Sequence, residues 1–121
     1  MTGIEKAMDL SNFGSINLFT LQSKTLDRGV DAEVTGNRLA IRGYDCGDIT
    51  AEWFGGCDCF DYDCYLDEIE TKKLFEAIVE ETGKPPREAI LMFQGSSCFE
   101  DFRAYCDLKG IKYVYSSWHA D

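Results

Sequence analysis

Residues 55–66 read GGCDCFDYDCYL and hold three cysteines, Cys57, Cys59 and Cys64. From residue 60 onward, apolar and acidic side chains alternate, which is the period-two pattern of a strand with one apolar face and one acidic face. The two glycines in front of this strand let the backbone bend. The stretch therefore predicts a turn that leads into a strand, with thiols gathered near the turn.

Further strands are expected on both sides of this stretch. Alternating apolar residues predict strands at 15–23, 30–34 and 38–46, and β-branched and aromatic residues predict a closing strand at 111–118. Gly and Asn at 35–37 tolerate the positive φ of a hairpin turn. The first half of the chain is therefore predicted to form mostly antiparallel hairpins.

The second half of the chain switches to the helical period. Asp67, with Glu70 three residues later, predicts a capping box at the start of a helix. Gly83, followed by two prolines, predicts the end of that helix. A short helix or strand is expected over 88–93.

A last helix is predicted to begin at Ser97, which forms a second capping box with Glu100, and to end at Lys109-Gly110. The chain has 121 residues, a length that favours one domain. We therefore expect a single α+β domain over 1–121. It should have a mostly antiparallel sheet with two or three helices on one face.

The chain is strongly acidic, with 22 Asp and Glu against 12 Lys and Arg and a net charge of −10. Such a surface repels nucleic acid and anionic membranes and attracts basic proteins. The alternative is that the acidic charge only keeps the protein soluble. No segment has the apolar length of an export signal or a membrane-spanning helix. We therefore expect a soluble cytoplasmic protein that binds neither nucleic acid directly nor a membrane.

The clustered thiols predict a metal site. Cysteines in a reducing compartment stay unpaired, and zinc takes four thiolate or imidazole ligands in a tetrahedron. The predicted ligands are Cys46, Cys57, Cys59 and Cys64, with His119 as the alternative fourth ligand. The fold is therefore expected to be stapled by a zinc site.

Other interpretations of the six cysteines stay open. Buried unligated thiols and disulfides are the alternatives to zinc, and Cys98 and Cys106, on the last predicted helix, are expected in the core. A thiol enzyme needs a base, and the single histidine, His119, lies only two positions before the last residue of the sequence. The acidic run near residue 60 lacks the spacing of a calcium-binding loop. The chain is therefore expected to be non-enzymatic.

Part of the sequence resembles a group of small uncharacterised bacterial proteins. The likeness covers about half of the chain and implies no activity. It lies in the stretches 44–48, 52–55, 60–62, 67–68, 102–103 and 110–113 and in Trp118.

In its length, acidity, cysteine cluster and lack of an enzymatic signature, the chain is similar to phage anti-CRISPR proteins of the type II-A class. These are small acidic inhibitors of Cas9, and one member contains zinc. The resemblance implies binding to a basic lobe of Cas9, in the cytoplasm of the host bacterium, and interference with the loading of guide RNA or target DNA.

Cas9 holds its heteroduplex in a positively charged channel, which an acidic protein could occupy or obstruct. The predicted contact is an acidic face, with Trp53 or Phe54 as an apolar anchor unless these two are core residues. The competing interpretations are a thiol- or metal-dependent enzyme or redox protein and a bacterial domain of another function. The predicted partner-binding residues are Glu52, Asp58, Asp61, Asp63 and Glu68.

Overall fold

The computed structural model describes residues 10–48 and 59–120. Five strands lie in these two segments, together with three α-helices and one 3-10 helix, η1. The strands are β1 (Ser15–Gln22), β2 (Asp27–Thr35), β3 (Arg38–Cys46), β4 (Cys59–Tyr65) and β5 (Val114–Ala120). The helices are α3 (Glu68–Thr82), α4 (Pro86–Ala89), η1 (Ile90–Phe93) and α5 (Cys98–Lys109).

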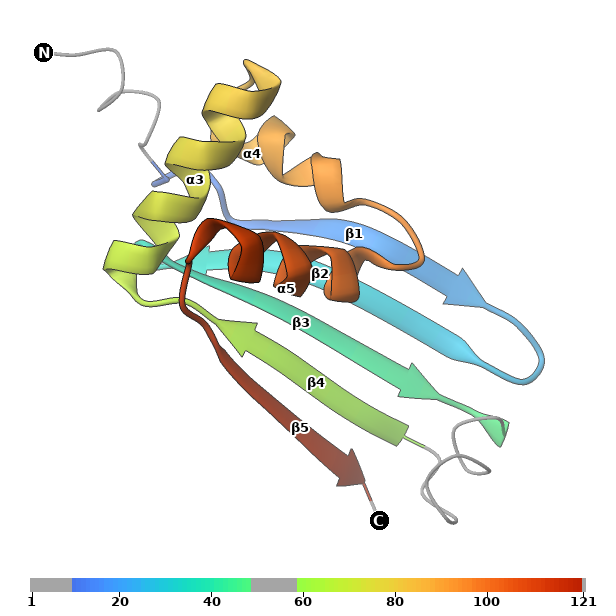
Figure 1. Ribbon diagram of the computed structural model, residues 1–121. Coiled ribbons are helices and arrows are strands. Elements are labelled where there is room, and N and C mark those ends of the chain that lie inside the picture. The colour runs from blue at the N-terminus through green and yellow to red at the C-terminus, as the bar shows by residue number, and fades with distance from the viewer. Residues whose placement is uncertain (1–9, 49–58, 121) are drawn as a thin grey trace, which may run out of the picture.

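The strands form one antiparallel sheet in which spatial order follows chain order, β1-β2-β3-β4-β5. The helical segments connect β4 to β5, and they all cover the same face of the sheet (Figure 1). The predicted α+β architecture is therefore confirmed in its sheet, its helices and their placement. The opposite face, which we call the open face, carries no helix in the described part of the chain.

The core lies between the sheet and the helices. Side chains of a strand alternate between its two faces, so every second residue of β2, β3 and β4 points at the helices. Phe75 of α3 and Phe102 of α5 are fully buried. Burial of each such side chain contributes about 1.5–3 kcal/mol to the free energy of folding. The strand residues that meet these helices are Val30, Ala32, Leu39, Ile41, Tyr62 and Cys64.

Helix α3 is fixed to the sheet at its first turn. Asp67 is its N-cap, and the Asp67 carboxylate accepts a hydrogen bond of 2.8 Å from the Glu70 N–H, which confirms the predicted start. The fully buried Thr71 hydroxyl accepts from the Leu39 N–H at 3.0 Å and donates to the Leu66 carbonyl at 3.3 Å. These bonds satisfy buried backbone groups and hold the helix over β3.

Two local predictions differ from the structure. Ser97 precedes α5, but its backbone (φ −103°, ψ 20°) is not extended and its side chain makes no capping bond. The closing strand begins at Val114 and not at Ile111, because the backbone of Ile111 caps the C-terminus of α5. The Ile111 N–H donates to the Cys106 carbonyl at 2.8 Å, beyond the left-handed Gly110, as in a Schellman motif.

Candidate functional site

The open face carries the polar side chains that alternate with the core residues. Ile41 and Cys64 are fully buried against the helices, so their neighbours Arg42 and Asp63 lie on the open face. The same alternation puts acidic side chains of β2 and β4 on this face. The open face is therefore the polar face of the sheet.

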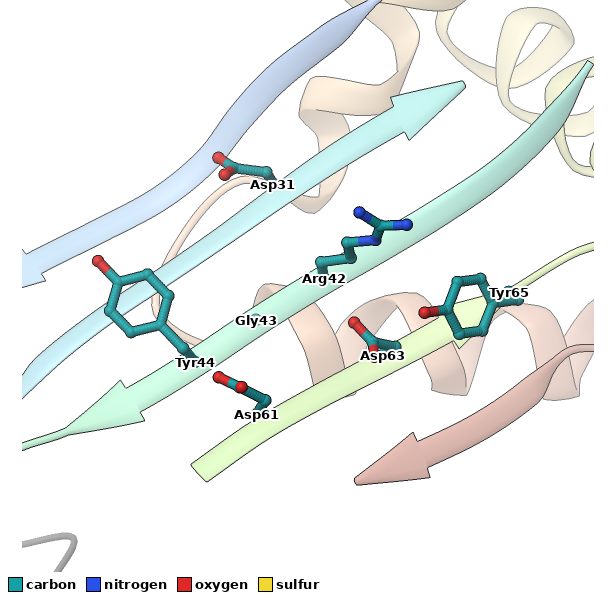
Figure 2. A pocket seen from close by; sticks show the side chains of 7 residues that line it. All are labelled: Asp31, Arg42, Gly43, Tyr44, Asp61, Asp63 and Tyr65. Atoms are coloured by element: carbon teal, nitrogen blue, oxygen red, sulfur yellow. The ribbon is translucent and has the colours of Figure 1, made fainter. Parts of the chain in front are cut away.

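A groove of about 400 Å³ lies on the open face (Figure 2). It spans three strands, because Arg42 of β3 is in register with Asp31 of β2 and with Asp63 of β4. We call it the acidic groove, since three carboxylates and one guanidinium line it. Its lining residues are Asp31, Arg42, Gly43, Tyr44, Asp61, Asp63 and Tyr65.

Two tyrosines give the acidic groove aromatic surface. Tyr44 lies against Gly29, its cross-strand partner, and a Cβ at Gly29 would be only 2.6 Å from the Tyr44 Cε1 atom. The glycine thus leaves room for the ring to lie across β2. Tyr44 is 39 % exposed and Tyr65 is 38 % exposed. The groove therefore offers partly exposed rings beside its charges.

The charges of the groove are only partly compensated. Arg42 pairs with Glu33 at 3.3 Å, and Asp31 accepts a hydrogen bond of 2.9 Å from the Asn17 amide. In residues 10–48 and 59–120, the carboxylates of Asp61 and Asp63 have no hydrogen-bond or ion-pair partner. Both carboxylates are therefore available to an external cation.

The structure brings together two of the predicted partner-binding residues, Asp61 and Asp63. Glu68 is exposed in the first turn of α3 and does not line the groove. Glu52 and Asp58 lie outside the described residues, as do the proposed anchors Trp53 and Phe54. The sequence-based interpretation omitted Asp31, Arg42, Tyr44 and Tyr65, all of which line the groove.

The predicted ligands Cys46 and Cys59 form a disulfide between β3 and β4. The two residues are directly opposite each other in the register, with Cα atoms 4.1 Å apart. This disulfide contradicts the prediction that all cysteines of the chain are reduced. It joins the two strands that flank 47–58, so the covalent staple of the described structure is a disulfide.

The predicted fourth ligand, Cys64, lies on the opposite face of β4 from this disulfide. Five positions separate Cys64 from Cys59, and an odd spacing reverses the face of a strand. Cys64 is fully buried, and burial raises the pKa of its thiol to about 12. Within the described residues, no three His, Cys, Asp or Glu side chains are grouped to hold a metal.

The positions of Cys46, Cys59 and Cys64 contradict the predicted zinc site with four thiolate ligands. A disulfide does not supply thiolates, and Cys64 cannot reach the other two sulfur atoms through the sheet. Cys57 lies outside the described residues. His119 is in register with Phe60 on β5, and its side chain is not described. Cys98 and Cys106 are buried core residues, as predicted.

A second polar cluster lies on the helix face, beside α5. The Arg28 guanidinium donates to both Asp45 oxygens, at 2.7 and 3.0 Å, and the Tyr62 hydroxyl donates to Asp45 at 3.1 Å. Burial, and then the Asp45 charge, raise the pKa of Tyr62. The Tyr62 ring lies against Gly43, where no side chain would fit. This cluster is internally satisfied and joins β2, β3 and β4.

The fold and the groove define an α+β protein with an antiparallel meander sheet, helices on one face and an acidic open face. No family model, curated protein or solved structure matches the chain. None of the described helices is both long enough and apolar enough to span a bilayer.

Proposed function

We propose that this chain is a non-enzymatic binding protein whose open face docks on a basic surface of a nucleic-acid-handling protein. The observation that carries the proposal is the pair of uncompensated carboxylates, Asp61 and Asp63, in a groove with aromatic surface. A lysine or arginine of a partner could meet these carboxylates while its apolar stem lies on Tyr44 or Tyr65.

The overall charge supports this proposal. A net charge of −10 attracts a cationic partner over a distance and favours the correct orientation on encounter. The binding energy itself must come from a few central contacts, because charges at the rim of an interface contribute little. The partly exposed rings of Tyr44 and Tyr65 are suitable central contacts, since aromatic residues dominate binding energies.

The free thiols of the described residues argue against thiol catalysis. The reactive form of cysteine is the thiolate. Burial raises the pKa of Cys98 to about 11 and the pKa values of Cys106 and Cys64 to about 12. These three thiols are therefore protonated at neutral pH and enclosed in the core, which favours a binding role over a catalytic one.

Cas9 is the partner that the resemblance of the sequence to type II-A anti-CRISPR proteins implies. Its heteroduplex channel is positively charged, so a small acidic protein is a suitable competitor for that surface. In this proposal, docking of the open face prevents the loading of guide RNA or target DNA. The inhibition requires no chemistry from the inhibitor.

Pull-down with Cas9, with and without guide RNA, tests the proposal when it is followed by a DNA-cleavage assay. We expect binding that weakens as salt increases, and loss of cleavage when the chain is added before target DNA. If Cas9 is neither bound nor inhibited at about 0.1 M salt, this partner is wrong.

A further inference from the structure

The two edges of the sheet differ in how their backbone groups are used. An edge strand presents unpaired N–H and C=O groups to its surroundings, and proteins usually protect such edges. Strands β1 and β5 are the two edges. In the described part of the chain, β1 is protected and β5 is not.

The edge of β1 is occupied by other parts of the chain. The Arg87 guanidinium donates to the carbonyls of Phe13 and Ser15. The Gly95 N–H donates to the Leu18 carbonyl at 3.2 Å. An irregularity in the β1–β2 register between Asn17 and Phe19 interrupts the strand further. The outer edge of β1 is therefore irregular and partly covered, so it is a poor site for pairing with an added strand.

The register shows which groups of β5 are free. The Leu66 N–H donates to the Leu39 carbonyl, so Leu66 points its backbone groups toward β3. Backbone directions alternate along a strand, so Asp63 points its groups toward β5, where it pairs with Ser116. The next residues, Tyr115 and Ser117, therefore point their N–H and C=O groups away from β4, at the outer edge.

The outer edge of β5 has no protecting feature among the described residues. Within residues 10–48 and 59–120, no backbone hydrogen bond occupies this edge, and neither Tyr115 nor Ser117 has a further hydrogen-bond partner there. The sequence of β5, VYSSWHA, contains no proline, lysine or acidic residue. Val114 is 66 % exposed. Unprotected edges of this kind accept strands from other chains.

We propose that β5 pairs with an extended segment of the basic partner, so that the partner adds a sixth strand to the sheet. This inference rests on the proposed function and specifies how the partner binds. The occupant is a strand with Lys or Arg at alternate positions, on the side of the open face.

The carboxylates of β4 and the small side chain of Ser116 on β5 favour a basic strand as the occupant of this edge. A strand added to β5 lies two strand spacings, about 10 Å, from the row of Asp61 and Asp63 on β4. Ser116, which is in register with Asp63, is small, so a long basic side chain can extend over β5 toward that carboxylate. A second copy of the chain would instead bring two acidic sheets edge to edge, each chain with a net charge of −10.

A peptide of eight residues that alternates lysine and valine is a direct probe. Its control is the same peptide with N-methyl groups on alternate residues, which keeps the charge but removes hydrogen-bond donors. We expect the control to bind at least about tenfold more weakly, as measured by isothermal titration calorimetry. The control lacks the donors of at least two backbone hydrogen bonds, and the loss of two such bonds accounts for a decrease of at least this size.

The matched protein variants are Ser117→Pro, which removes an outward N–H, and Ser117→Ala, which keeps it. Proline is tolerated at an edge position whose N–H does not pair within the sheet. We expect Ser117→Pro to weaken peptide binding at least about tenfold and Ser117→Ala to leave it unchanged. Circular dichroism checks that each variant folds. In the wild type, the amides of Tyr115 and Ser117 should become protected from hydrogen exchange when the peptide binds.

Three results would overturn the inference. The first is equal affinity for the two peptides with no new protection of Tyr115 and Ser117. If Asp61→Asn/Asp63→Asn still weakens binding in that case, the acidic-groove proposal stands and only the strand pairing is wrong. The second is the absence of any peptide binding at low salt, which removes the groove proposal as well. The third is a dimer of the wild type that Ser117→Pro abolishes, which would assign the edge to a second copy.

Discussion

Asp45 accepts two hydrogen bonds from its cross-strand partner Arg28, from Nε at 2.7 Å and from Nη2 at 3.0 Å. Asp45 is only 6 % exposed, so Arg28→Met leaves a nearly buried carboxylate without its cation. We expect the free energy of unfolding to fall by about 1.5–3 kcal/mol, the range for hydrogen bonds to charged groups. Urea denaturation at neutral pH measures this loss.

The control for Arg28→Met is the double variant Arg28→Met/Asp45→Asn, which removes the buried charge as well. It should recover part of the lost stability, because a neutral amide costs less to bury than an unpaired carboxylate. A single variant within about 0.5 kcal/mol of wild type would show that the pair does not stabilise the sheet.

The Cys46–Cys59 disulfide should contribute substantially to stability. The two cysteines are 13 positions apart, and closing a loop of about this size contributes about 3 kcal/mol in the chain-entropy model. Reduction, or the double variant Cys46→Ser/Cys59→Ser, should therefore lower the melting temperature by roughly 10 °C. Differential scanning calorimetry measures the shift.

The matched control adds reductant to the double serine variant, whose melting temperature should not change. The disulfide and the zinc site predicted from the sequence also differ in their response to a chelator. If a chelator lowers the melting temperature of the wild type and a reductant does not, the disulfide is not the staple and the zinc prediction regains support.

The buried thiols predict a loss of stability at alkaline pH. Burial raises the pKa of Cys64 to about 12 from its usual value of 9.0. A group whose pKa is raised in the folded state stabilises the fold fully below the unfolded pKa, and this contribution is lost as pH rises toward the folded pKa. Each such thiol should remove about 1.4 kcal/mol per pH unit between those two values.

The variant Cys64→Ala tests this dependence. Its free energy of unfolding should be lower at neutral pH, because a buried sulfur is lost, but it should fall less steeply than that of wild type between pH 10 and pH 11. Urea denaturation across this range provides both slopes. Equal slopes would mean that Cys64 ionises as readily in the folded chain as in the unfolded one.

The sheet could be predicted because its pattern is local. Alternation in residues 38–46 gave a strand with the observed bounds, and the capping residue Asp67 and the terminating Gly83 defined α3. The end of α5 at Lys109-Gly110 was also predicted correctly, but the closing strand begins at Val114 and not at the predicted Ile111. The hydrogen bond from the Ile111 N–H to the Cys106 carbonyl depends on three-dimensional closure of the last helical turn, which the sequence pattern does not show.

The candidate site was predicted only in part, because it depends on pairing between strands. The acidic side of β4 followed from alternation, which identified Asp61 and Asp63. Their neighbours Asp31 and Arg42 come from other strands, and only the register brings them together. Parity also explains the error at Cys64, whose odd spacing from Cys59 already indicated opposite faces.

The acidic open face is the central claim, and its most direct test is the affinity for Cas9 of two variants with equal net charge. Asp61→Asn/Asp63→Asn changes the groove, whereas Glu76→Gln/Glu80→Gln removes two charges from exposed positions on α3. Isothermal titration calorimetry at about 0.1 M salt should show at least about tenfold weaker binding for the groove variant and near wild-type binding for the helix variant. Equal affinities of the two variants would contradict the claim, because binding would then depend on net charge and not on the groove.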